Sequence, residues 1–88
     1  MVSQAVTITN ATGLHLRPAG VLCELSMGFK SKITFKTDDN YEANAKSVLS
    51  VLGACVKPQQ TIVLACDGED EEEALKTLVH AIETGLGE

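Results

Sequence analysis

The sequence is poor in basic residues and contains a single arginine, Arg17. Its seven lysine and arginine residues are outnumbered by twelve acidic residues, which gives a formal net charge of -5. Nucleic-acid backbones and anionic membranes are themselves negatively charged, so a chain with this balance has little general affinity for either. We therefore expect no nucleic acid and no membrane among its partners.

Long apolar runs and targeting signals are also lacking. No apolar stretch approaches the roughly 18 residues that a membrane-spanning helix requires. The residues after Met1 contain neither the basic segment nor the apolar core of a secretory signal. We expect a cytoplasmic protein with one small domain, residues 1–88, whose binding site lies on the surface or in a shallow groove.

The three cysteines form no CxxC pair and have no histidine at zinc-binding spacing. We therefore expect no disulfide framework, no metal site and no cofactor. Cys23, Cys55 and Cys66 are interpreted as small buried or half-buried apolar side chains in a reducing compartment.

Alternating apolar residues predict short strands with one solvated face. The alternation covers residues 4–9, 31–37 and 41–45, and residues 38–40 supply a turn between the last two segments. Residues 61–67 are almost continuously apolar, which predicts a central strand that is more buried than this hairpin.

Helical spacing or helix caps mark two segments in the first two thirds of the chain. Apolar residues recur every three to four positions from Leu16, and Gly28 marks the expected end of this helix. Residues 48–54 suit a two-turn helix, for which Ser47 is a good N-cap.

The last predicted helix begins with five consecutive acids, residues 69–73, and ends at Gly85. Acids in a first helical turn offset the helix dipole, so we interpret them as solvated side chains rather than as a metal or partner site. His80 lies off the apolar stripe of this helix and is interpreted as a surface residue.

The order of these elements is strand, helix, strand, strand, short helix, strand, helix. It resembles the split βαβ pattern and predicts an α/β (α+β) fold of the open-faced β-sandwich type. In this arrangement, βαββαβα, three helices cover one face of a four-stranded antiparallel sheet. A fold class alone does not name a function.

The stretch GLHLRPAG, residues 13–20, joins the first strand to the first helix. Proline is tolerated in the first turn of a helix, so Pro18 predicts a helix start at His15 or Leu16. His15 then lies near free backbone N–H groups that attract anions, and the guanidinium of Arg17 suits phosphate. A neutral imidazole can accept a phosphoryl group and later release it. From these residues alone, the alternative is an ordinary polar cap beside a surface charge.

Together, GLHLRPAG and AKSVLSVLG (residues 45–53) resemble the two motifs of HPr, the histidine-containing phosphocarrier of the bacterial sugar phosphotransferase system. The resemblance extends over essentially the whole chain and implies a stoichiometric carrier rather than an enzyme. It implies that phosphorylated enzyme I phosphorylates His15 on Nδ1, and that His15 passes the group to enzyme IIA domains of sugar permeases. Arg17 and the backbone amides of Leu16 and Arg17 would stabilise the phosphorylated state.

Ser47 matches a second site of this family. In low-GC Gram-positive members, HPr kinase/phosphorylase phosphorylates that serine, which slows transfer through the histidine and promotes binding to a catabolite-control transcription factor. A phosphate there would add about -1.5 to -2 charges beside the partner surface. The alternative is that Ser47 is only a helix cap.

We also predict a docking surface beside His15. Val48, Leu49 and Leu52 form it as an exposed apolar patch with a polar rim, and Gly20 is assigned to the same partner-binding surface. The alternative is that these side chains belong to the core.

Some features depart from the family pattern. Leu16 is bulkier than the small or hydroxyl residue that is often found there, Gly20 loosens the helix, and the turn at residues 38–40 is one residue longer. The main hypothesis is a monomeric phosphocarrier. A regulator that acts through Ser47, a carrier of a nitrogen-related branch, and a small binding module without phosphoryl chemistry are the alternatives.

Overall fold

The computed structural model describes residues 1–87, so the last residue of the predicted domain lies outside the described part. The chain follows the predicted βαββαβα order. Its strands are β1 (Val2–Thr7), β2 (Lys32–Lys36), β3 (Glu42–Asn44) and β4 (Thr61–Asp67). Its helices are α1 (Leu16–Met27), α2 (Val48–Gly53) and α3 (Glu71–Glu83).

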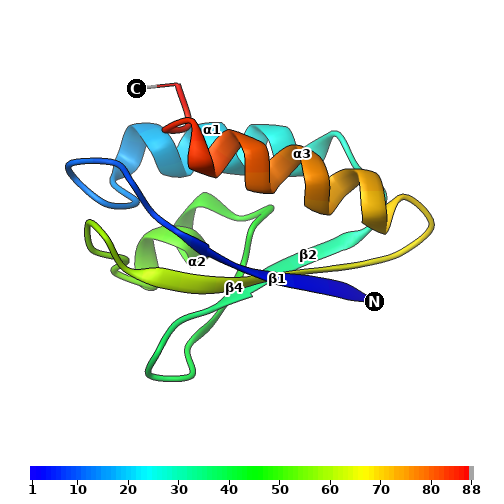
Figure 1. The fold of residues 1–88 in the computed structure, drawn as a ribbon, viewed down its shortest axis with the longest axis horizontal. Helices are drawn as coiled ribbons and strands as arrows, with labels where there is room; N and C mark the ends of the chain where they lie inside the picture. Colours follow the sequence, from blue (N-terminus) through cyan, green and yellow to red (C-terminus); the bar gives the residue numbers. More distant parts are fainter. Residues whose placement is uncertain (88) are drawn as a thin grey trace.

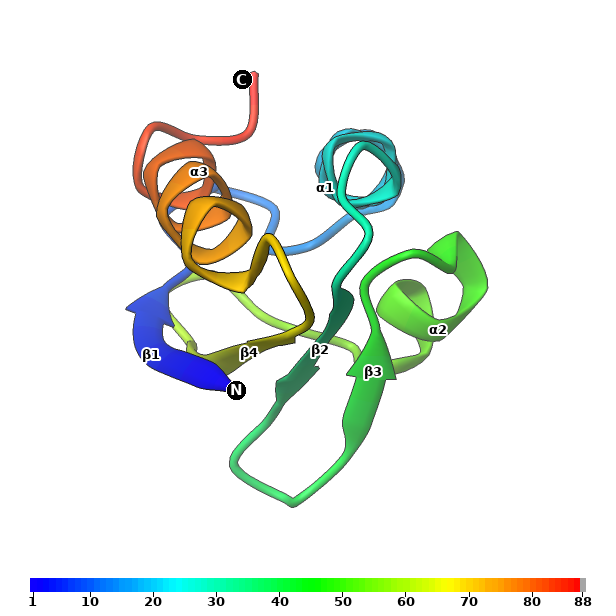
Figure 2. The same ribbon diagram turned by 90° about the vertical axis from the view of Figure 1, so that its right-hand side faces the viewer.

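The strands form one antiparallel sheet in the order β1-β4-β2-β3. Helix α3 packs on β1 and β4, α1 lies between α3 and α2, and α2 packs on β3 (Figures 1 and 2). The helices cover one face of the sheet, and the opposite face is open. The predicted open-faced sandwich is therefore confirmed.

The core lies between the sheet and the helices. The strand register places Ala43, Phe35 and Leu64 in one row on the covered face, and all three side chains are fully buried. Ala19 and Leu22 of α1 belong to the same buried core. The apolar stripe of α3 also belongs to it and consists of Ala74, Leu78, Val79 and Ile82. Burial of these side chains is the main stabilising contribution to the fold.

Strand β4 is central, as predicted, but it is not buried on both faces. Its side chains alternate, so that Ile62 and Leu64 are fully buried whereas Val63 is 45% exposed. The physical reason is that no helix within residues 1–87 covers the second face of the sheet (Figure 2). Burial along β4 therefore alternates as it does along the hairpin strands, although the composition of β4 is almost continuously apolar.

Two smaller expectations also need correction. Cys55 is exposed rather than buried, because it follows the end of α2 and adopts a left-handed backbone conformation with φ of 53°. Cys23 and Cys66 are half-buried and buried, as expected. Helix α3 ends with Thr84 rather than Gly85 as its C-cap residue. His80 is exposed, which confirms its surface position.

Two negative findings apply to residues 1–87. No helix in this range has the length and apolar character needed to cross a membrane. Within the same range, no group of three or more His, Cys, Asp or Glu side chains is arranged to hold a metal ion.

Candidate functional site

The N-terminus of α1 is open to solvent. His15 is its N-cap residue with extended backbone angles, φ of -76° and ψ of -178°, and its side chain makes no capping hydrogen bond. The first turn contains no acidic residue. The first N–H groups of a helix have no intrahelical acceptor, so those of Leu16 and Arg17 are available to an external anion. The helix start predicted from Pro18, which is the third helical residue, is confirmed.

The side chains around this helix end face solvent. His15 and Arg17 are exposed, and Leu16 retains 61% of its surface. Together with Thr12, these three residues line a shallow hollow. The structure thus places His15 and Arg17, for which the sequence predicts phosphoryl chemistry, at one small concave surface.

The backbone before His15 is held firmly. The amide of Gly13 donates to the carbonyl of Asn10 at 3.1 Å, and the amide of Leu14 donates to the carbonyl of Val56 at 3.1 Å. Gly13 has φ of 69°, and a Cβ atom there would lie 2.3 Å from the Val56 carbonyl oxygen. Glycine is therefore required for this close approach. The buried Leu14 side chain anchors the segment next to the exposed imidazole.

The arrangement has a clear chemical preference. A helix of 12 residues directs the positive end of its dipole at the hollow. The guanidinium of Arg17 adds N–H donors in a planar array that matches phosphate oxygens. The imidazole of His15 supplies a nitrogen nucleophile. These groups suit a phosphoryl dianion that is attached to His15 covalently and held by donors around it.

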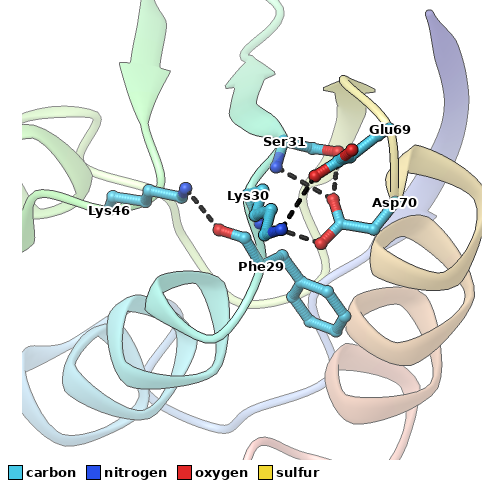
Figure 3. A network of polar contacts seen from close by, with 6 residues as sticks. All are labelled: Phe29, Lys30, Ser31, Lys46, Glu69 and Asp70. Atoms are coloured by element: carbon cyan, nitrogen blue, oxygen red, sulfur yellow. Dashed lines mark hydrogen bonds and ion pairs between the residues drawn. The ribbon is translucent and has the colours of Figure 1, made fainter.

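Ser47 is the N-cap residue of α2, as predicted. Its Oγ accepts a hydrogen bond from the amide of Ser50 at 3.2 Å. The preceding residue, Lys46, is tied to α1 and to the loop after it. Cys23 Sγ donates to the Lys46 carbonyl at 3.2 Å, and Lys46 Nζ donates to the Phe29 carbonyl at 2.7 Å (Figure 3). The half-buried Ser47 hydroxyl therefore has a structural role in the free protein.

The predicted docking residues differ in exposure. Leu49 is 82% exposed, whereas Val48 and Leu52 are half-buried, and Leu52 packs against the core. Helix α2, which carries them, packs against α1. Gly20 on α1 is half-buried, and a Cβ atom there would meet nothing within 4 Å. Leu16 on α1 and Leu49 on α2 are both exposed large apolar side chains, and their use in docking stays a prediction.

The acidic run contains a feature that sequence reasoning missed. Asp70 accepts hydrogen bonds from the amides of Lys30 and Ser31 at 2.8 and 2.9 Å and from the Ser31 hydroxyl (Figure 3). The hydrogen bond from Ser31, with that from Lys30, lowers the pKa of Asp70 from 3.8 to about 2. The interpretation of all five acids as solvated side chains was therefore wrong for Asp70, which locks the loop after α1 to the start of α3.

Of its neighbours in the run, Glu69 conforms to the expectation, but Glu71 does not, because its side chain is 23% exposed and pairs with the N-terminal ammonium at 3.2 Å. Glu69 pairs with Lys30 at 3.0 Å, but both side chains are largely exposed, so the pair adds little stability. Glu71 accepts a hydrogen bond from the amide of Gly68 at 3.1 Å. The only sequence signal for Asp70 was its position directly before a helix, which does not identify partners 40 residues away.

The comparisons with known proteins agree with this geometry. Residues 2–84 match the family described as "PTS HPr component phosphorylation site". Phosphocarrier protein NPr of Escherichia coli strain K12 is 37% identical over 87 residues, which cover 99% of this chain and 97% of that protein. Phosphocarrier protein HPr of Lysinibacillus sphaericus is 35% identical with complete coverage of both chains. The HPr-like protein Crh of Halalkalibacterium halodurans is 35% identical over 94% of this chain and 98% of its own.

Solved structures show the same relationship. HPr-C-His from Thermoanaerobacter tengcongensis superposes with a TM-score of 0.94 at 38% identity and covers 100% of this chain and 98% of its own. An HPr dimer from the same organism has a TM-score of 0.78 at 39% identity, with full coverage of both chains. The chain therefore belongs to the HPr family, whose phosphocarrier proteins carry phosphoryl groups and are not enzymes.

Proposed function

We propose that the protein is a phosphocarrier that accepts a phosphoryl group on His15 from phosphorylated enzyme I and passes it to enzyme IIA domains of sugar permeases. The observation that carries this proposal is the open N-terminus of α1. It combines an exposed imidazole, an exposed guanidinium and uncapped amides, with no acid in the first turn.

In the proposed transfer, the lone pair on Nδ1 of the neutral His15 imidazole attacks phosphorus. The N–P bond forms while the bond to the enzyme I donor breaks, and the donor keeps that electron pair. The dianionic group then meets the amides of Leu16 and Arg17 and the guanidinium of Arg17. The reverse chemistry at an enzyme IIA nucleophile releases it.

The docking surface is assigned to Leu16 and Leu49, flanked by Val48, Leu52 and Gly20. Two exposed leucines on adjacent helices provide an apolar centre that a partner can desolvate. Both enzyme I and the enzyme IIA domains need access to His15 from this side, so one surface serves both in turn.

Ser47 is proposed as a regulatory phosphorylation site for an HPr kinase/phosphorylase, and the product as a ligand of a catabolite-control transcription factor. The supporting observation is its position at the start of α2, directly before Val48 and Leu49. Phosphorylation there replaces a neutral cap with about two negative charges next to an apolar docking surface.

Two relatives define the alternatives. The similarity to NPr favours a carrier of a nitrogen-related branch as the second candidate, with the same chemistry at His15. The similarity to Crh fits a mainly regulatory protein that acts through Ser47. The pairing of His15 with Arg17 supports transfer over pure regulation. A monomeric, cytoplasmic carrier is the form we propose, and light scattering in solution distinguishes it from a dimer.

The decisive experiment uses radioactive phosphoenolpyruvate and a cognate enzyme I. We expect label on the native protein that is lost in acid and stable in alkali, as for phosphohistidine. His15→Ala should abolish the labelling, whereas His80→Ala, which removes the other exposed imidazole, should leave it unchanged. An unlabelled native protein beside an active enzyme I would falsify the proposal.

A further inference from the structure

Lys46, the residue before Ser47, is held by hydrogen bonds at its amide, its carbonyl and its ammonium group. Its amide donates to Asn44 Oδ1 at 2.9 Å, and its carbonyl accepts from Cys23 Sγ at 3.2 Å. Its ammonium group donates to the Phe29 carbonyl at 2.7 Å (Figure 3). We call these three hydrogen bonds the Lys46 clamp. Because they reach β3, α1 and the loop after α1, they leave Lys46 little freedom to move.

The contact of the Lys46 ammonium group has an electrostatic cause. The Phe29 carbonyl lies two residues beyond the end of α1, and the last turn of α1 contains no basic residue. A cation near the C-terminus of a helix is attracted by the carbonyls that lack an intrahelical partner there. Within residues 1–87, Lys46 has no carboxylate at ion-pair distance. Lys46 therefore supplies the positive charge that the last turn of α1 itself lacks.

The contacts of Ser47 itself are local. Its amide donates to the Asn44 carbonyl at 3.0 Å, its carbonyl accepts from the Val51 amide at 3.0 Å, and its Oγ accepts from the Ser50 amide at 3.2 Å. All these partners lie between residues 44 and 51. The Lys46 clamp adds the hydrogen bonds that tie this segment to α1 and to the loop after it.

We propose that Lys46 is a positioning residue for the phosphorylation of Ser47, because its clamp holds the serine in the place where a kinase binds it. This inference rests on the proposed regulatory function of Ser47. In that reaction, Ser47 Oγ forms a bond to the γ-phosphorus of a nucleoside triphosphate and loses its proton to a base of the kinase. The bond to the nucleoside diphosphate breaks, and the diphosphate keeps the electron pair. A segment that is already ordered costs less free energy to bind.

The first experiment measures amide hydrogen exchange by NMR and needs no kinase. Lys46→Met removes the ammonium group, Lys46→Arg keeps a cationic donor, and Lys36→Met removes a charge from the exposed face of the sheet. We expect the amides of Ser47 and Ser50 to exchange about five- to tenfold faster in Lys46→Met. The other two variants should stay within about twofold of the native protein. If the buried Leu64 amide in β4 accelerates equally, Lys46 only stabilises the whole fold and the inference is wrong.

The second experiment uses HPr kinase/phosphorylase and ATP. Lys46→Met should raise the KM for the protein about fivefold with kcat within about twofold, because the lost order is restored on binding. Lys46→Arg and Lys36→Met should resemble the native protein. A raised KM without faster exchange at Ser47 and Ser50 would mean that Lys46 contacts the kinase directly, which overturns the inference, as would a native KM.

The two experiments also separate this inference from the function on which it rests. If an active kinase does not phosphorylate Ser47 of the native protein, the regulatory function fails, and the positioning role fails with it. Faster exchange in Lys46→Met would then show that the Lys46 clamp orders the start of α2 for another reason.

Discussion

The N-termini of α1 and α3 differ in the charge of their first turns. The helices have 12 and 13 residues, so their dipoles are comparable. The first turn of α3 contains Glu71, Glu72 and Glu73, and that of α1 contains no acid. The positive end of α3 is therefore compensated within the chain, whereas that of α1 is left for an anion from outside.

The polar contacts beside the two helix starts differ in the same way. Asp70 and Glu71, at the start of α3, bind amides of the loop after α1 and of Gly68. At the start of α1, His15 has no capping contact. The α3 end is thus a structural joint, and the α1 end is the proposed binding site. Proximity to a helix end does not distinguish the two, but the charges within the first turn do.

The largest effect is expected for a substitution at the start of α1. Arg17→Ala removes the only guanidinium, and charge-assisted hydrogen bonds contribute about 1.5 to 3 kcal/mol when fully formed. Because the site is exposed, we expect phosphorylation of His15 by enzyme I to slow by about tenfold. Lys76→Ala, on the exposed face of α3, makes the same change in net charge and should leave the rate unchanged. Equal rates for both variants would mean that Arg17 acts only through net charge.

The second prediction concerns the hydrogen bonds of Asp70 at the start of α3. Asp70→Asn keeps the shape of the side chain but weakens its hydrogen bonds to Lys30 and Ser31, so we expect a lower urea midpoint with unchanged phosphorylation of His15. The folded pKa of about 2 lies below the usual 3.8. The stability from the Asp70 carboxylate is therefore complete above about pH 4 and is lost as the pH falls towards 2.

Urea titrations of the native protein and Asp70→Asn across this pH range test the linkage. The difference between the two midpoints should shrink as the pH falls below 4 and continue to shrink as the pH falls through 2. A difference that is independent of pH would instead assign the effect to packing around the side chain.

The smallest effect is expected when α1 is given an acidic first turn like that of α3. Leu16→Glu places an acid in the first turn of α1, which should raise the free energy of unfolding by about 0.5 kcal/mol. The same charge competes with phosphate, so phosphorylation of His15 should fall about two- to fivefold, and less at high salt. Leu16→Gln controls for the lost apolar surface, and the comparison of the two helix ends fails if both variants behave alike.

Features that depend on neighbouring residues in the chain could be predicted. Pro18 indicated the start of α1 because its missing N–H is tolerated only in the first turn. Ser47 indicated the start of α2 because its hydroxyl reaches an amide three residues away. The alternation of apolar residues in β2 and β3 predicted the hairpin, since successive side chains of a strand point to opposite faces.

Features that depend on distant segments could not be predicted. Asp70 binds residues 39 and 40 positions away, and the apolar composition of β4 does not reveal that one face of the sheet lacks a cover. The exposure of Cys55 likewise follows from the backbone path after α2. No local pattern distinguished these residues from their neighbours.

The sequence by itself determined the order of the elements, the position of His15 at a helix start and the presence of Arg17 beside it, because capping and periodicity operate over a few residues. Only the tertiary structure decided that Thr12 shares the hollow with His15, that Val56 holds the preceding loop, and that Asp70 locks α3 to the loop after α1. These contacts join segments far apart in the chain, and their geometry is set when the helices pack on the sheet.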